Sequence, residues 1–216
     1  MQKPDSKFIA EQLRKPHGAY AKEIAEFMSK ANRKMYNMIF QKIKLQPNDR
    51  ILELGPADGS FVEHLFQIEP ILHYTGVDFS EEMIQAANLK NQHRVNEQTV
   101  SFVHSTFDNF TGNKKYDKIF SVNTVYFWDD VQALLLHLKK QLSPGGLLLL
   151  AFRTGESMKQ MPFTEFGFKF FEAKDLTKAL TDAGFHTIHH VSASESIVLP
   201  EGTDTTLSNV CMVASH

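Results

Sequence analysis

Apolar residues recur at helical spacing near the start of the chain. Between residues 20 and 43 they return every three or four positions, which predicts an amphipathic helix, with Asn32 as the point where it would break in two. Residues 6–15 predict a shorter helix that ends ahead of Pro16. We therefore expect a helical N-terminal segment over residues 1–44.

From residue 51 onward, short apolar runs alternate with amphipathic segments. The runs that predict strands are 51–54, 73–77, 99–103, 116–122 and 147–152. Helices are expected over about 59–68, after the N-cap residue Ser80, and over 131–142. Strands alternating with helices predict a parallel sheet with right-handed crossovers. Every residue of 147–152 is apolar, as in a strand buried on both faces.

The last part of the chain follows a different order. A helix is expected over 174–183, and then 185–191 and 210–214 read as two strands with no helix between them. The polar segment 192–209 would be their connection, so this pair should be antiparallel at one sheet edge. The expected fold is α/β: a doubly wound, seven-stranded, mostly parallel sheet with an antiparallel C-terminal edge pair, in one domain over 1–216.

Composition agrees with a soluble globular chain, since 42% of the residues are hydrophobic and 22% are charged. The longest purely apolar run, 147–152, is too short to span a bilayer, and the first twenty residues contain no apolar stretch of signal-peptide type. Cys211 is the single cysteine, which excludes an intrachain disulfide and a cysteine zinc cluster. The simplest expected location is a reducing cytoplasm.

Charge is distributed unevenly although the net charge is only −2. Residues 1–50 hold eleven Lys and Arg against five Asp and Glu, whereas the remainder holds twelve against twenty. A basic leading segment can contact anionic lipid, nucleic acid or an acidic substrate. The alternative is a pair of helices with a solvated basic face.

The glycine-bearing loop after the first strand carries the main chemical signal. Such a loop lets backbone approach a ligand closely, at a sheet edge where nucleotide cofactors bind. A dinucleotide fingerprint starting at Gly55 would need glycine at 57 and 60, but the chain has Ala57 and Ser60. Asp78 follows the second strand, where a carboxylate can accept hydrogen bonds from both ribose hydroxyls of either cofactor type.

Several segments resemble, in order and spacing, those of class I S-adenosylmethionine-dependent methyltransferases. The loop resembles the motif E/D-x-G-x-G-x-G, with alanine in place of the middle glycine, and the likeness extends over roughly residues 45–190. The segments that carry it are 45–55, 76–83, 116–128 and 142–146. Within the superfamily the chain looks most similar to the UbiE-like small-molecule methyltransferases. The resemblance implies a Rossmann-like core over 45–216 and an N-terminal helical lid over 1–44.

The same resemblance assigns roles to residues of the cofactor site. The methionine side of the cofactor would be held by Glu53, Gly55, Ala57 and Gly59. The nucleoside side would be held by Asp78 at the ribose, by Phe79 and Met83 beside the adenine, and by Thr106 and Phe107 after the third strand. Thr106 stands where aspartate is common, and Asp108 is the alternative contact to the adenine amino group. Asn123 and Thr124 would lie near the sulfonium.

Ala57 is tolerable in this loop if its backbone has a negative φ. Phe79 has a second interpretation, as a core aromatic at a strand end. The aromatic run Tyr126, Phe127 and Trp128 would flank the methyl group or the acceptor, or alternatively pack against the following helix.

Two regions are expected to shape the acceptor pocket. One is the N-terminal helical segment, with Tyr20, Phe27 and Met28. The other is segment 158–171, with two methionines and five phenylalanines, which suits an apolar or aromatic acceptor or else seals the sheet edge. No catalytic residue stands out; the conceivable general bases are His17, Tyr20, Tyr126, Asp129 and Asp130. No metal site is expected, and His186, His189 and His190 read as solvent-facing residues of an edge strand.

The sequence thus predicts an S-adenosylmethionine-dependent methyltransferase that releases S-adenosylhomocysteine and acts on a small-molecule or lipid-like acceptor. One alternative is a non-catalytic S-adenosylmethionine-binding protein, which the substitutions at Ala57 and Thr106 would suit. A less favoured alternative is an NAD-dependent oxidoreductase, against which Ser60 argues. No nucleic-acid partner is expected because no base-amino methyltransferase motif and no RNA-binding module are visible. Peripheral membrane contact through the basic N-terminus is left open.

Overall fold

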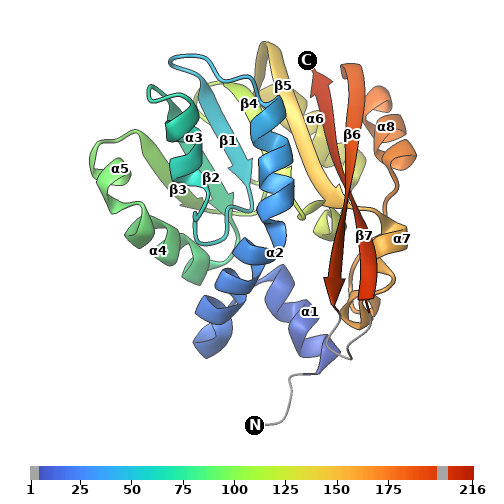
Figure 1. Cartoon of the computed structure of the whole chain (residues 1–216). Coiled ribbons are helices and arrows are strands. Elements are labelled where there is room, and N and C mark those ends of the chain that lie inside the picture. The colour runs from blue at the N-terminus through green and yellow to red at the C-terminus, as the bar shows by residue number, and fades with distance from the viewer. Residues whose placement is uncertain (1–4, 199–203) are drawn as a thin grey trace.

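A seven-stranded sheet organises the molecule, and the computed structural model describes residues 5–198 and 204–216 (Figure 1). The strand order is β3-β2-β1-β4-β5-β7-β6. The strands are β1 (Arg50–Leu54), β2 (His73–Asp78), β3 (Val100–His104), β4 (Tyr116–Val122), β5 (Leu142–Arg153), β6 (His186–Val198) and β7 (Asp204–Ser215). The strands β1 to β5 pair in parallel, and β7 runs antiparallel to both β5 and β6. The predicted doubly wound sheet with its antiparallel edge pair is confirmed.

Helices cover both faces of this sheet, and α2 crosses one of them lengthwise (Figure 1). The main helices are α1 (Ser6–Arg14), α2 (Ala21–Lys42), α3 (Val62–Ile68), α4 (Glu81–Lys90), α5 (Gln92–Asn96), α6 (Val131–Gln141), α7 (Gly155–Met158) and α8 (Ala173–Asp182). The short 3-10 helices are η1 (Gly18–Tyr20), η2 (Val125–Phe127) and η3 (Pro162–Glu165). Side-chain caps begin several of them: Ser80 accepts from the Met83 amide, and Asp130 accepts from the Ala133 amide.

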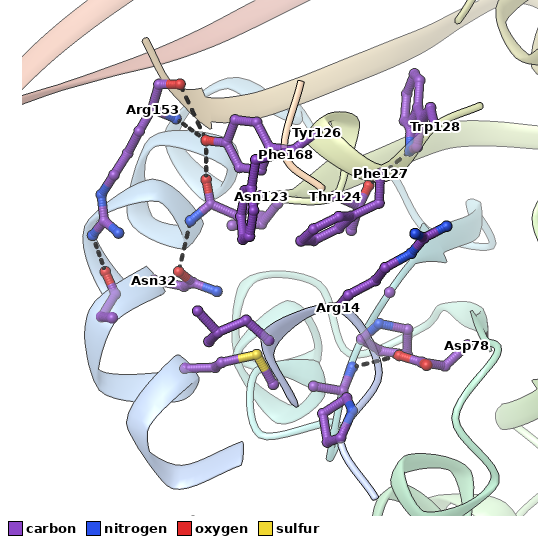
Figure 2. A pocket seen from close by; sticks show the side chains of 18 of the residues that line it. Arg14, Asn32, Asp78, Asn123, Thr124, Tyr126, Phe127, Trp128, Arg153 and Phe168 are labelled. Atoms are coloured by element: carbon purple, nitrogen blue, oxygen red, sulfur yellow. Dashed lines mark hydrogen bonds between the residues drawn. The ribbon is translucent and has the colours of Figure 1, made fainter. Parts of the chain in front are cut away.

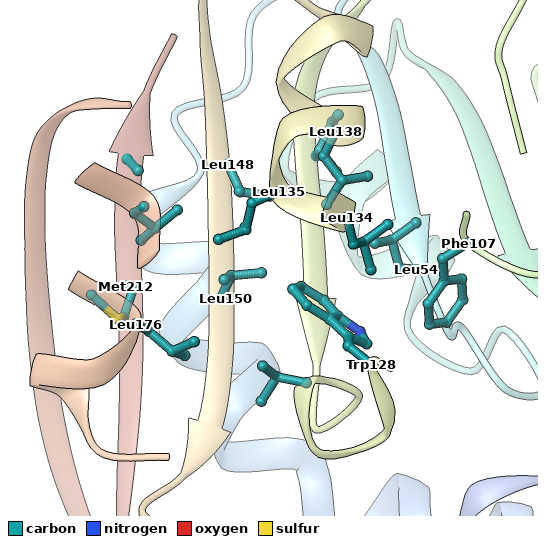
Figure 3. Close-up of a cluster of buried hydrophobic side chains, with 14 of the residues drawn as sticks. Leu54, Phe107, Trp128, Leu134, Leu135, Leu138, Leu148, Leu150, Leu176 and Met212 are labelled. Carbon is teal, nitrogen blue, oxygen red and sulfur yellow. The ribbon is translucent and has the colours of Figure 1, made fainter. Parts of the chain in front are cut away.

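Alternate strand residues feed two separate hydrophobic cores. One core lies between the sheet and α6 and α8, as Figure 3 shows, and includes Leu52, Leu54, Leu148, Leu150 and Met212. The other lies under α2 and α3 and includes Ile51, Phe120, Leu149, Ala151 and Cys211. Because successive side chains of a strand point to opposite faces, a strand covered on both sides must be apolar throughout. This explains the unbroken apolar run of β5.

Three local expectations were wrong. First, α2 runs without a break through Asn32. Second, β5 begins at Leu142 rather than 147, with a register shift in its pairing with β4 around the Pro144-Gly145 segment. Third, most of the segment 192–209 is not a loop, because β6 and β7 stay paired as far as Val198 and Asp204. Residues 199–203 of that segment lie outside the described residues.

The far end of the β6–β7 pair was missed because it has few apolar residues, and apolar periodicity is the signal that predicts a strand. Its pairing is satisfied by backbone hydrogen bonds, which polar side chains do not prevent. The hairpin extends beyond the carboxyl end of β5, toward α7 (Figure 1). None of the helices in residues 5–198 and 204–216 combines the length and the hydropathy needed to cross a bilayer.

Candidate functional site

The carboxyl ends of β1 and β4 meet where the chain changes direction across the sheet. The chain moves from β1 outward to β2 and β3, and then returns to β4 on the other side of β1. Such a reversal leaves a crevice between the two loops that follow the central strands, which is where open α/β sheets bind ligands. A cavity of about 740 Å³ opens there. Figure 2 shows part of its lining.

The loop after β1 turns through three left-handed residues, with φ of +74° at Gly55, +50° at Ala57 and +66° at Gly59. Ala57 therefore does not meet the condition of a negative φ under which the sequence made it tolerable. A Cβ at Gly55 would lie 2.6 Å from Thr124 Cγ2, so only glycine lets the loop approach the end of β4. The left-handed conformation costs a non-glycine residue such as Ala57 roughly 1 kcal/mol.

Only part of the predicted methionine-side loop faces the cavity. Gly55 and Ala57 line the cavity, whereas Glu53 and Gly59 are not part of its lining. A Cβ at Gly59 would lie 2.6 Å from Asn91 Nδ2, so this glycine serves close packing of the loop against α4.

Glu53 is buried beneath the loop between two tyrosines. Its Oε1 accepts from the Tyr36 hydroxyl at 2.5 Å, and its Oε2 accepts from the Tyr74 hydroxyl at 2.6 Å. Burial raises the pKa of Glu53 to about 7, although both tyrosine hydrogen bonds act to lower it. Because Tyr36 belongs to α2, this carboxylate ties the N-terminal helix to β1 and β2. Its contact with a cofactor amino group stays a prediction.

Asp78 ends β2 at the cavity wall, where its carboxylate is held by two backbone amides. Oδ1 accepts from the Ser80 amide at 2.9 Å, and Oδ2 accepts from the Ala57 amide at 3.3 Å. Burial raises the pKa of Asp78 to about 6 despite these hydrogen bonds. At pH 7 the carboxylate is mostly ionised and remains able to accept further hydrogen bonds from a ligand.

The aromatic and polar residues expected around the adenine lie close to Asp78, with one exception. Phe79, Thr106, Phe107 and Asp108 all line the cavity, and the Phe79 and Phe107 rings meet edge to face at 6.2 Å between centroids. Met83 does not line it. It is almost fully buried and packs against Ala21, Ala25 and Ala57, beneath the loop and α2.

At the end of β4, Asn123 and Thr124 face the same cavity. Asn123 has φ of +55° and donates through Nδ2 to Asn32 Oδ1 at 2.8 Å (Figure 2). Thr124 Oγ1 accepts from Trp128 Nε1 at 3.0 Å, which holds the indole in the core next to the site. Asn32 was not predicted as a site residue. The sequence offered one signal for it, a polar residue within a helix that has many apolar positions.

The conceivable general bases have structural roles or are exposed. The Tyr126 hydroxyl oxygen lies 2.8 Å from Asn123 Oδ1 and accepts from the Arg153 amide at 2.6 Å. Burial raises the pKa of Tyr126 well above its ordinary value, so it does not act as a base near neutrality. Asp130 caps α6, and the exposed Asp129 carboxylate lies 4.0 Å from Arg14.

The two remaining candidates lie on the N-terminal segment. The His17 Nδ1 atom lies 2.9 Å from the Lys15 carbonyl oxygen, and the Tyr20 ring packs on Phe8. Neither His17 nor Tyr20 belongs to the cavity lining.

A second part of the cavity, where the sequence predicts the acceptor, is lined by apolar side chains from three separate regions. They are Phe27 and Met28 of α2, Met158, Met161, Phe163 and Phe168 of the segment after β5, and Ile197 of β6. Met161 packs with Leu207, so the β6–β7 hairpin supports this wall. We refer to these seven residues as the acceptor chamber. Phe166 and Phe170 of the same segment are exposed instead.

Two charged residues of the chamber region were not predicted. Arg153 at the end of β5 and Glu195 of β6 both belong to the cavity lining. The position of Arg153, the first charged residue after an apolar parallel strand, was a usable signal, because ligand sites lie at such strand ends.

The histidines of the edge strand β6 take no part in this site. His186, His189 and His190 are exposed. Among residues 5–198 and 204–216, no group of three His, Cys, Asp or Glu side chains is placed to hold a metal ion.

The family model of a methyltransferase domain matches residues 14–190. The chain belongs to this family. The match contains the glycine loop, Asp78, the end of β4 and the segment 158–171, whereas Glu195 and Ile197 of the cavity lining lie beyond it. The resemblance to class I S-adenosylmethionine-dependent methyltransferases is thereby confirmed.

Curated relatives include two enzymes of one named activity. The malonyl-(acyl-carrier protein) O-methyltransferase 2 of Ilyobacter polytropus is 31% identical over 140 residues, which are 61% of this chain and 53% of that protein. The malonyl-(acyl-carrier protein) O-methyltransferase of Bacillus cereus is 34% identical over 112 residues, which are 52% of this chain and 40% of that protein. The chain thus spans about half the length of the curated relatives it matches.

Solved structures agree on the fold. A structure of the complex between the Haloferax volcanii Trm112 methyltransferase activator and a methyltransferase matches with a TM-score of 0.73 at 21% identity, covering 92% of this chain and 97% of that one. The Haemonchus contortus phosphoethanolamine N-methyltransferase 2, solved with S-adenosylhomocysteine, matches with a TM-score of 0.68 at 12% identity, covering 98% of this chain and 60% of that one. These likenesses confirm the Rossmann-like methyltransferase fold.

Proposed function

We propose that this protein transfers a methyl group from S-adenosylmethionine to a small-molecule acceptor with an apolar body. The observation that carries the proposal is one continuous cavity with two chemically different halves. One half has the backbone of Gly55 and Ala57 and the Asp78 carboxylate, and the other is the acceptor chamber. This arrangement suits two ligands that react with each other.

The residues of the first half suit the cofactor. A Cβ at Gly55 would meet Thr124, so the loop leaves bare backbone beside the end of β4. Asp78 offers an ionised carboxylate for ribose hydroxyls, and Phe79 and Phe107 offer apolar surfaces for adenine. Glu53 and Met83 act from beneath this surface, by fixing the loop and α2.

The chemistry needs positioning more than a catalytic side chain. When bound, S-adenosylmethionine supplies a methyl group on a positively charged sulfur, which leaves as a neutral thioether. The protein's contribution is to hold the acceptor in line and to exclude water, and such positioning provides effective molarities of about 10⁵ M or more. Tyr126 and Asp129 line the cavity, but the Tyr126 hydroxyl is hydrogen-bonded to Asn123 and to the Arg153 amide, and Asp129 is exposed, which agrees with this division of labour.

The acceptor chamber indicates the kind of molecule that is methylated. Its phenylalanines and methionines provide an adaptable apolar wall, which suits an aliphatic or aromatic body. The relatives named as malonyl-(acyl-carrier protein) O-methyltransferases act on a carrier-bound acyl group, and an acyl chain is one such body. Two basic residues of the N-terminal helices, Arg14 of α1 and Lys30 of α2, belong to the cavity lining. Contact of this basic segment with a membrane stays a prediction.

The proposal is tested by ligand-induced stabilisation followed by a transfer assay. A ligand at 100 times its dissociation constant adds about 2.7 kcal/mol to the unfolding free energy. We expect S-adenosylmethionine and S-adenosylhomocysteine to raise the melting temperature and NAD to leave it unchanged. Labelled methyl transfer to amphipathic acceptors should follow. Stabilisation by NAD alone would refute the proposal, and cofactor binding without transfer to any acceptor would favour a binding protein.

A further inference from the structure

Unpartnered buried polar atoms gather at one point of the sheet. Among residues 5–198 and 204–216, the buried side-chain nitrogen and oxygen atoms without a hydrogen-bond partner are Arg153 Nε and both amide atoms of Asn209. Buried polar groups are nearly always paired, and an unpaired one costs about 1–3 kcal/mol. Two neighbouring residues with unpaired buried polar atoms lower the stability of the fold, and such violations are expected at functional sites.

These residues share one face of the antiparallel end of the sheet. Arg153 of β5 is directly opposite Asn209 of β7, which is directly opposite Ala193 of β6. Residues opposite each other in antiparallel strands project from the same face, and so do alternate residues of one strand. Glu195 and Ile197 follow Ala193 at alternate positions and therefore share this face, and both line the cavity.

Arg153 is held in place from two sides. Its Nη2 donates to Glu195 Oε1 at 2.8 Å and to the Ala31 carbonyl oxygen of α2 at 2.9 Å, and Figure 2 shows the side chain reaching toward α2. Its backbone amide donates to the Tyr126 hydroxyl. The side chain of Arg153 is 14% exposed and that of Glu195 is 19% exposed. The pair is thus a fixed, mostly desolvated donor and acceptor at the edge of the acceptor chamber.

We propose that Arg153 and Glu195 determine acceptor specificity by binding an uncharged polar group that both accepts and donates hydrogen bonds, such as a carboxamide or a hydroxyl. This inference rests on the proposed methyltransferase function and names the polar end of its acceptor. Arg153 supplies a donor and Glu195 an acceptor. The apolar body of the acceptor lies in the chamber of Phe27, Met28, Met158, Met161, Phe163, Phe168 and Ile197.

The charges of the site disfavour an ionic group. Glu195 already neutralises Arg153, so a ligand carboxylate would face Glu195 without compensation. An ammonium group would face the guanidinium in the same way. Lys30, the cation that α2 contributes to the lining, is exposed and therefore screened by water. Asn209 is a positioning residue, since its buried amide lies beside Arg153 and contributes a polar surrounding to the guanidinium.

The test compares four probes with the same linear alkyl chain: octanamide, octanol, octanoate and octylammonium. Their affinities are measured by calorimetry with saturating S-adenosylhomocysteine present. We expect octanamide and octanol to bind about tenfold or more tightly than the two ions. Arg153→Met should weaken binding of octanamide and octanol about tenfold or more, because a hydrogen bond to a charged group is lost, and should make octylammonium the preferred probe, because Glu195 is then free to pair with it. Arg33→Met is the matched control, since Arg33 is exposed on α2 and is not part of the cavity lining.

Two further variants keep the result interpretable. If Arg153→Met leaves Glu195 unpaired and unfolds, the double variant Arg153→Met/Glu195→Leu removes both charges together. Asn209→Leu should raise stability while weakening octanamide binding, whereas a purely structural amide would change stability alone. The inference is overturned if the wild type prefers octanoate or binds none of the probes. It is also overturned if Arg153→Met shows the same selectivity among the probes as the wild type. Failure of the wild type to bind S-adenosylhomocysteine would instead defeat the proposed function.

Discussion

Replacing Asp78 by asparagine should stabilise the ligand-free protein and weaken cofactor binding. Burial raises the pKa of Asp78 from an ordinary value near 3.8 to about 6. Each pKa unit corresponds to about 1.4 kcal/mol, so the ionised carboxylate costs the folded state about 3 kcal/mol at pH 8. Asparagine avoids that cost, but its side-chain NH2 group would face the backbone N–H of Ser80 or Ala57. The hydrogen bond lost there costs about 1 kcal/mol. The expected net gain is about 2 kcal/mol.

The pH dependence distinguishes this explanation from a general packing effect. Because the folded pKa of Asp78 is raised, the native state binds more protons than the unfolded state between pH 6 and 3.8, and wild-type stability rises as pH falls through that window. The Asp78→Asn advantage should therefore be full above pH 6 and shrink below it. The charge of Asp78 also helps to raise the pKa of Glu53, so Asp78→Asn should lower the pKa of Glu53 slightly and add to the advantage of the variant above pH 6.

The assay is urea unfolding of ligand-free protein at pH 8 and pH 5, with Asp108→Asn as the control, because Asp108 lines the same cavity but is exposed. In the same samples, S-adenosylhomocysteine should bind Asp78→Asn about tenfold or more weakly, through loss of charge-assisted hydrogen bonds. An Asp78→Asn protein that is less stable than wild type at pH 8, or an advantage that is equal at both pH values, would refute the reasoning.

Three further predictions concern the loop, the buried carboxylate and the tyrosine of η2. Ala57→Gly should raise the unfolding free energy by roughly 1 kcal/mol in urea denaturation, because glycine has no penalty at φ +50°; a loss of stability would contradict it. Tyr36→Phe should lower the unfolding free energy by about 2 kcal/mol by removing a hydrogen bond to buried Glu53, whereas the control Tyr20→Phe should change it little. Tyr126→Phe should lower kcat without altering the pH profile between pH 6 and 9, because burial raises the pKa of Tyr126 far above that range; loss of a titrating limb would show that it is a base after all.

Three hydrogen bonds connect α2 to the sheet next to the cavity. Tyr36 binds Glu53, Asn32 binds Asn123, and the Ala31 carbonyl accepts from Arg153. These contacts lie under the glycine loop, at the end of β4 and beside the acceptor chamber. One helix therefore touches both halves of the cavity, and its position sets the space available to cofactor and acceptor together.

The fold was predictable because its signals are local. Strand runs, helix periodicity and caps such as Ser80 depend on residues close together in the chain. The glycine loop and Asp78 were predictable for the same reason, since each stands directly after a strand whose end must lie at the ligand edge of the sheet. The far end of the β6–β7 hairpin was not, because its pairing rests on backbone groups that every residue carries.

The cavity's chemistry was decided by tertiary structure. Asn32 and Asn123 are 91 positions apart and meet only because α2 packs across the sheet. Arg153 meets Glu195 only because the C-terminal hairpin pairs beside β5.

Tertiary structure also decided the backbone conformation and the side-chain direction of individual residues. The positive φ of Ala57 and the burial of Met83 depend on what surrounds the loop. A sequence by itself determined the order of elements and the loop that approaches a cofactor. Which side chains enclose the acceptor was decided by the packing of distant segments, because direction and burial of a side chain are properties of its neighbours in space.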